Sequence, residues 1–251
     1  MSLPGAAPRV AEHGSPTPAP PTPRRTGGPA GRLSGRTFVI VAAFVGLVAV
    51  YATDQVVPAS SQHQADLRIW LAARAAGFVA LGLLTVQVVL GLVLSHPTNK
   101  TTWKLSKLLF PWHGNIWVFV LAFIGVHVVT LVADPYAGVG IGGALVPGLS
   151  SYRSAPVALG VIALYALLIT GLSARYTKAL PRGLWLQVHR VSLLVLALAW
   201  VHGILAGTDS IPLAIAYGGS FSLVVAAAAY RYWVARAGRP TFATSLPEVN
   251  R

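Results

Sequence analysis

Six long apolar segments constrain the fold of this 251-residue chain more than any other feature. A helix needs about 20 predominantly apolar residues to cross the hydrocarbon core of a bilayer, and the segments approach or exceed that length. Glycine, proline, asparagine and charged residues separate them, as is typical of connecting loops. The pattern predicts an all-α membrane protein, a six-transmembrane-helix bundle, with spans at 37–57, 69–94, 111–133, 156–172, 184–205 and 212–234.

The composition excludes a soluble globular domain and several kinds of metal site. Hydrophobic residues make up 55% of the chain and charged residues only 10%, against about 25% charged residues in soluble proteins. Cysteine is absent, which excludes disulfides, thiolate zinc sites, cysteine-ligated iron–sulfur clusters and covalently attached haem. Metal chemistry is then left to histidine or carboxylate ligands.

The basic charge of the chain follows the predicted topology. The chain has 19 Lys and Arg against 6 Asp and Glu, a net charge of +13, which by itself would suggest a nucleic-acid partner. Most of the basic residues fall in the N-terminal tail, in alternate loops and at the C-terminal end, whereas all four aspartates fall in the other loops. The positive-inside rule then places both termini in the cytoplasm. We therefore expect a multi-pass protein of the plasma (inner) membrane that lies in a lipid bilayer and binds no nucleic acid.

The two ends of the chain differ from the membrane body. Residues 1–36 hold 8 of the 18 prolines with several glycines and arginines, and such a segment buries too little apolar surface to offset its ordering entropy. We expect a disordered basic Pro/Gly-rich tail at 1–36, a six-helix transmembrane domain at 37–235 and a short cytoplasmic tail at 236–251.

Four of the seven histidines lie within predicted spans, where ionisable residues are rare and usually functional. The third span holds His113 and His127, which are 14 residues or about 21 Å apart along a helix. The fifth span holds His189 and His202, which are 13 residues or about 19.5 Å apart. Because the third and fifth spans run in the same direction, each of two levels receives one imidazole from each helix. This pattern suits axial ligation of one haem iron per level. The other histidines are expected to be solvated residues of the tail and loops: His13, His63 and His96.

The spacing in the fifth span does not fit one straight helical face. At 100° per residue, 14 steps return to within about 40° of the starting direction, whereas 13 steps end about 140° away. The fifth helix must therefore tilt, bend or present its histidines on different flanks if it serves both levels. Periodicity alone does not prove the pairing.

The H-x13-H segment at 113–127 and the H-x12-H segment at 189–202 resemble the histidine pairs of the ferric reductase-like transmembrane domain family. The resemblance covers about residues 70–235 and includes similarity to the haem-binding subunit of bacterial methionine sulfoxide reductase systems. It implies two non-covalent b-type haems, the inner one bound by His113 and His189 and the outer one by His127 and His202. Family members that are ferric reductases or NADPH oxidases continue into a flavin- and nicotinamide-binding domain. Here few residues follow Val234 and no Gly-rich phosphate loop is present, so we expect a separate electron donor, either a flavoprotein or a quinol.

Arg74 is the remaining candidate for a role at the outer haem. It lies about five residues inside the second span, at the predicted level of His127 and His202. The arginine either snorkels to the outer headgroups or, as the resemblance implies, pairs with haem propionates or holds an anionic acceptor. Three glycines near the histidines could admit a flat macrocycle or serve helix packing: Gly91, Gly125 and Gly203.

Three functions are compatible with these patterns. The first is transmembrane electron transfer through two bis-His haems, from a cytoplasmic or quinol donor to an external acceptor. Such a protein is a transmembrane haem oxidoreductase that acts with a separate donor or acceptor protein. The second is a cytochrome b anchor subunit of a quinone-linked dehydrogenase, which quinone-site inhibitors and co-purifying subunits would reveal. The third is a haem-free transporter or scaffold whose histidines form interhelical hydrogen bonds, although no predicted span centre carries the Asp or Glu of a proton relay.

Overall fold

The computed structural model describes residues 35–56, 61–95, 103–181, 183–208, 211 and 213–237, and none of these lies in a β-strand. The predicted tails, 1–36 and 236–251, lie almost wholly outside the described residues, as do His13 and His96; of His63 only the helical backbone is described. The helices are α1 (Gly35–Val56), α2 (Gln62–Leu94), α3 (Trp103–Ala133), α4 (Gly140–Leu145), α5 (Ser154–Arg175), η1 (Thr177–Ala179), α6 (Leu184–Arg190), α7 (Ser192–Ala206) and α8 (Ala214–Ala237).

The helical class predicted from the sequence is confirmed for the described residues, and each of the six apolar segments is helical. Four of these helical segments are long and apolar enough to cross a membrane, as in a multi-pass membrane protein: Leu67–Leu94, Lys104–Ala133, Ser154–Arg175 and Leu184–Ala206. The shortest has 22 residues, or about 33 Å of helix, which exceeds the roughly 30 Å hydrocarbon core. The first and sixth predicted spans coincide with α1 and α8, and their insertion remains a prediction.

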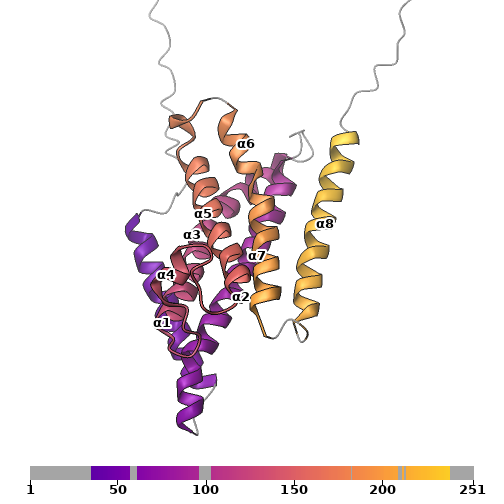
Figure 1. Ribbon diagram of the computed structural model, residues 1–251. Coiled ribbons are helices and arrows are strands. Elements are labelled where there is room, and N and C mark those ends of the chain that lie inside the picture. Colours follow the sequence, from indigo (N-terminus) through magenta and orange to yellow (C-terminus); the bar gives the residue numbers. More distant parts are fainter. Residues whose placement is uncertain are drawn as a thin grey trace, which may run out of the picture. The chain divides into compact units, whose positions relative to one another are not determined.

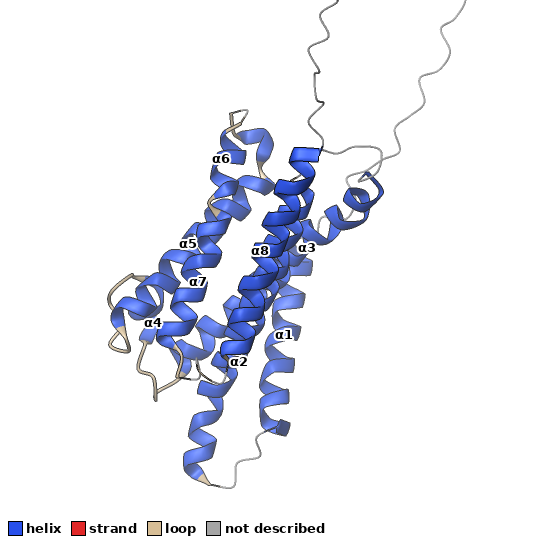
Figure 2. Cartoon of the chain, turned by 90° about the vertical axis from the view of Figure 1, so that its right-hand side faces the viewer, coloured by secondary structure: helices blue, strands red, loops and turns tan. Residues whose placement is uncertain are grey.

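The long helices lie lengthwise beside one another (Figures 1 and 2). α2 packs along α3, α5 along α7, and α8 against α2. Buried side chains from α2, α3, α5 and α7 form one shared core that includes Leu84, Val120, Leu167 and Leu196. The connection between α5 and α6 lies at the same end as the C-terminal end of α8, and α4 lies at the opposite end (Figure 1).

The fifth predicted span is divided between its two histidines. α6 ends at Arg190 and α7 begins at Ser192. Val191 between them donates its backbone N–H to the carbonyl of Val188 at 3.0 Å, an i to i−3 bond typical of a tight 3₁₀ turn. The interruption is one of the departures from a straight helix that the 13-residue spacing required.

Two other boundaries differ from the sequence-based expectation. The third helix begins at Trp103, and Pro111, where the span was expected to start, lies inside it. The Gly/Pro-rich stretch after Ala133 is folded rather than irregular throughout: it contains α4, and the carboxylate of Asp134 accepts the N–H of Ala137 at 2.9 Å. Hydrophobic span length locates the part of a helix that fits a bilayer, so it does not detect polar extensions or short helices at the surface.

Candidate functional site

The four histidines of the predicted spans meet as two pairs inside the bundle. The ring centres of His113 and His189 are 6.0 Å apart, and those of His127 and His202 are 6.3 Å apart. The two ring planes cross at 87° in the first pair and 78° in the second. The structure thus brings together the residues that were expected to share each level. Because α3 is continuous between its two histidines, the levels are about 21 Å apart along it.

Three of the four imidazoles are anchored through Nδ1 to a backbone carbonyl of a neighbouring helix. His113 reaches the carbonyl of Gln87 at 3.0 Å and His127 that of Ala73 at 2.7 Å, both on α2. A carbonyl oxygen can only accept a hydrogen bond, so Nδ1 carries the proton and Nε2 keeps its lone pair. This is the usual outer contact of a metal-bound histidine, since it sets the tautomer and the direction of the ring.

Each of these two carbonyls lies four residues before a glycine that faces the same ring. A Cβ atom on Gly77 would lie 2.9 Å from Nδ1 of His127, and one on Gly91 would lie 3.1 Å from Cε1 of His113. α2 therefore offers the same seat twice, 14 residues apart, to the two histidines that are 14 residues apart on α3.

The seat occurs a third time on α5. His202 bonds through Nδ1 to the carbonyl of Pro156 at 2.8 Å, and a Cβ atom on Gly160, four residues later, would lie 2.7 Å from that nitrogen. His189 differs, because its Nδ1 is buried and has no hydrogen-bond partner among the described residues.

The spacing of both pairs suits one metal ion between two imidazoles. A metal held by two opposed imidazole nitrogens at about 2.0 Å each places the ring centres about 6.2 Å apart, close to the two separations found here. No group of three or more His, Asp or Glu side chains that could hold a metal occurs in the described part of the chain. A haem iron needs only two protein ligands, because the porphyrin supplies the other four nitrogens. The donor set therefore fits haem.

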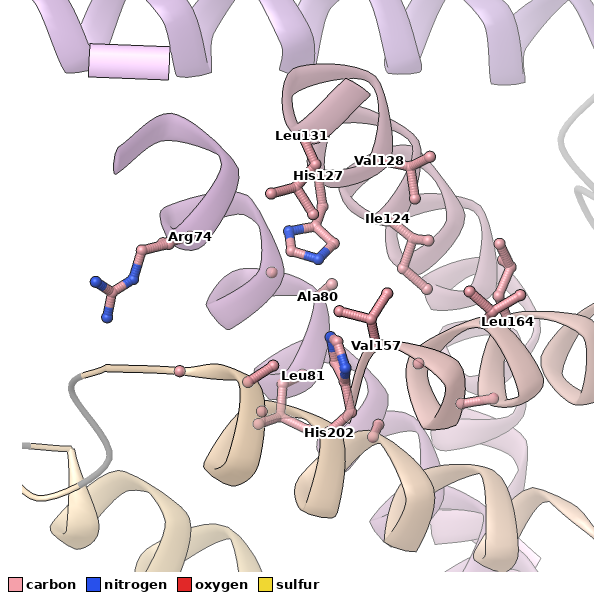
Figure 3. Close-up of a pocket in the computed structure, with 18 of the residues that line it drawn as sticks. Arg74, Ala80, Leu81, Ile124, His127, Val128, Leu131, Val157, Leu164 and His202 are labelled. Carbon is pink, nitrogen blue, oxygen red and sulfur yellow. The ribbon is translucent and has the colours of Figure 1, made fainter. Parts of the chain in front are cut away.

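The outer pair faces a cavity between α2, α3, α5 and α7, and its two rings point toward one another across that space (Figure 3). Most of the lining is aliphatic, such as Ile124, Leu164 and Val195. Aromatic and polar side chains contribute at one end, among them Trp70, Tyr152 and Arg74. An apolar cavity with a few converging polar groups is the usual form of a cofactor site.

Arg74 lies at the edge of this cavity with its side chain directed away from the two rings (Figure 3). Its Nη1 donates to the hydroxyl of Thr208 at 2.7 Å, and its guanidinium carbon lies 5.7 Å from the ring centre of Trp70. The arginine therefore holds the connection between α7 and α8 in this structure. Its pairing with a propionate or an anionic acceptor remains a prediction.

The glycine seats were found only in part from the sequence. Gly91 contacts a ligand candidate, but Gly125 has nothing within 4 Å of a built Cβ and Gly203 faces Tyr217 instead. Gly77 and Gly160 were missed. The signal that could have revealed the first was its 14-residue spacing from Gly91, equal to that of the two histidines on the facing helix.

Comparisons of the chain with models of protein families, with curated proteins and with solved structures find no match.

Proposed function

We propose that this chain is a transmembrane electron-transfer protein that holds two b-type haems and passes electrons from a cytoplasmic or quinol donor to an external acceptor. The observation that carries the proposal is the geometry of the two histidine pairs. Both have ring centres close to the bis-imidazole distance, and three of the four rings are anchored so that Nε2 is left to bind a metal.

The residues have distinct roles in this proposal. His113 and His189 hold the inner haem, and His127 and His202 hold the outer one. When bound, each haem supplies a one-electron Fe(III)/Fe(II) couple. The backbone carbonyls and glycines on α2 and α5 orient the imidazoles, and the apolar lining of the outer cavity excludes water. Export of an electron from a negative interior is favoured by about 2.3 kcal/mol per 100 mV, which supports the outward direction.

The proposal includes six spans in a plasma membrane with both termini in the cytoplasm. α1 and α8, with 22 and 24 residues, are long enough to be the first and sixth spans. Lys104, Lys107, Arg175 and Lys178 flank helix ends that an odd number of spans separates from α4 and its neighbouring loops. The positive-inside rule assigns those ends to the cytoplasm.

A haem-free scaffold is the second candidate, because the anchored histidines also form hydrogen bonds between helices, from α3 to α2 and from α7 to α5. Interhelical hydrogen bonds of this kind stabilise membrane bundles. They do not require the opposed rings of two different helices to be spaced for a metal, which is why we favour haem.

Haem content of the purified protein tests the proposal directly. A pyridine haemochrome assay is expected to give two haem b per chain, with a b-type spectrum after dithionite reduction. Because the imidazole planes cross at 87° and 78°, the ferric protein is expected to show strongly anisotropic low-spin signals in electron paramagnetic resonance. Protein that folds and carries no haem would favour the scaffold.

Alanine variants of the histidines test the assignment of each site. His127→Ala and His202→Ala are each expected to lose the outer haem and keep the inner one, since only the outer iron loses a ligand. The three histidines outside the predicted spans are the controls, and alanine at His13, His63 or His96 is expected to leave both haems bound. Full haem content in all four variants of the paired histidines would contradict the assignment.

A further inference from the structure

The loop before α5 holds the end of α7. The last carbonyl groups of a helix have no partner within the helix, and here the three consecutive carbonyls of residues 205–207 accept bonds from two consecutive side chains. Arg153 Nη1 donates to the first at 2.7 Å and to the third at 3.0 Å, and Tyr152 Oη donates to the second at 3.1 Å. The positive charge of the arginine also complements the negative end of the helix dipole.

The backbone of Arg153 is strained at this contact. Its φ of 38° and ψ of 61° lie in the left-handed region, and no other non-glycine residue in the described part of the chain has a positive φ. L-residues avoid this region because Cβ comes too close to the following carbonyl oxygen. Such a conformation persists only where the surrounding contacts determine it, and the contacts made here are those to the end of α7.

The same stretch of α5 seats the outer ligand His202. Pro156, whose carbonyl accepts Nδ1 of His202, and Gly160, which packs against its ring, lie within two turns of Arg153. His202 itself lies one turn before the carbonyls that Arg153 and Tyr152 bind. A shift of α7 along α5 would therefore move the ring out of its seat.

Tyr152 also connects this contact to the helix that seats the other outer ligand. Its ring packs edge-on against Trp70 of α2, with ring centres 5.6 Å apart and planes at 76°. Trp70 precedes by three residues Ala73, whose carbonyl accepts Nδ1 of His127. Trp70 and Tyr152 both line the outer cavity.

We propose that Tyr152 and Arg153 are positioning residues for the outer histidine pair. They fix the register of α7 on α5 and so keep the ring of His202 opposite that of His127. This inference rests on the proposed function, because the pair is taken there to be a ligand pair.

Three substitutions test the inference in the full-length protein. Arg153→Gly removes the guanidinium and suits the left-handed backbone, so the loop keeps its fold. Tyr152→Phe removes one hydroxyl and keeps the ring on Trp70. Ser154→Ala is the matched control, because the hydroxyl of Ser154 donates to the carbonyl of Gly148 and not to α7.

Arg153→Gly is expected to lower the haem affinity of the outer site about tenfold, as for other outer contacts of metal ligands. It should also shift the low-spin resonance signal of the outer haem and leave that of the inner haem unchanged. Tyr152→Phe is expected to have a smaller effect of the same kind. An unchanged outer signal in Arg153→Gly, or an equal change in Ser154→Ala, would overturn the inference.

Hydrogen exchange separates this inference from the proposed function. Backbone amides of the peptide that ends α7 are expected to exchange faster in Arg153→Gly than in the wild type, and this readout does not depend on haem. Wild-type protein without haem would overturn the proposed function. Two haems per chain together with unchanged exchange and an unchanged outer signal would overturn the positioning role alone.

Discussion

At the scale of single residues, the direction of each candidate ligand is determined by residues that have no chemistry of their own. An imidazole N–H in an apolar interior is costly unless it is bonded, so the carbonyls of Ala73, Gln87 and Pro156 determine which ring nitrogen is protonated. The ring can approach the carbonyl only because the residue one turn later is glycine. This device leaves Nε2 as the nitrogen that can bind iron.

Alanine substitutions at the seating glycines are expected to weaken haem binding in proportion to the crowding. Gly160→Ala places a methyl group 2.7 Å from Nδ1 of His202, whereas Gly91→Ala places one 3.1 Å from His113. Loss of a correctly oriented metal ligand costs about 10- to 100-fold in affinity. We expect this loss at the outer site for Gly160→Ala and a smaller loss at the inner site for Gly91→Ala, as measured by haem titration of the apoprotein.

The control for this series is Gly125→Ala, because nothing lies within 4 Å of its built Cβ. Alanine is favoured over glycine in a helix by about 0.5–1 kcal/mol, so this variant is expected to be slightly more stable and to bind haem normally. Equal haem affinity in Gly160→Ala and Gly125→Ala would show that the glycine seat does not orient the histidine.

At the scale of elements, the apolar run lengths predicted where the long helices lie but not how they end or bend. The 13-residue spacing of His189 and His202 required a departure from a straight helix, yet nothing in the sequence indicated that Val191 would be its position. The break depends on the packing of α6 and α7 against α5, which is tertiary information. Likewise, α4 is a single short turn within a Gly/Pro-rich stretch, where apolar periodicity is too brief to detect.

The position of the break makes the register between the two histidines sensitive to insertion. One alanine inserted after Val191 rotates the rest of α7 by about 100° and takes His202 away from Gly160. We expect loss of the outer haem with retention of the inner one, because His189 precedes the insertion. The same insertion in the connection at 208–213 follows both histidines and should leave both haems bound. Two haems in both insertion variants would contradict the register.

At the scale of the whole molecule, the pairing of the histidines could be predicted from chain direction alone, since spans separated by one crossing run the same way. The seats on α2 and α5 could not, because they depend on which faces of neighbouring helices meet. The contact of Tyr152 and Arg153 with the end of α7 joins two loops far apart in sequence. A single sequence contains no signal for such a contact.

Orientation in the membrane is the property of the whole molecule that decides the direction of electron flow. Translocation of loops rich in Lys and Arg is disfavoured, so Lys178, between α5 and α6, is expected in the cytoplasm and Ser151, between α3 and α5, outside. The chain contains no cysteine, so Ser151→Cys and Lys178→Cys each introduce a single thiol at an exposed position. A membrane-impermeant maleimide applied to sealed right-side-out vesicles is expected to label the first, and to label the second only after the vesicles are opened. The reverse pattern would place the pair of His127 and His202 on the cytoplasmic side and reverse the proposed direction of transfer.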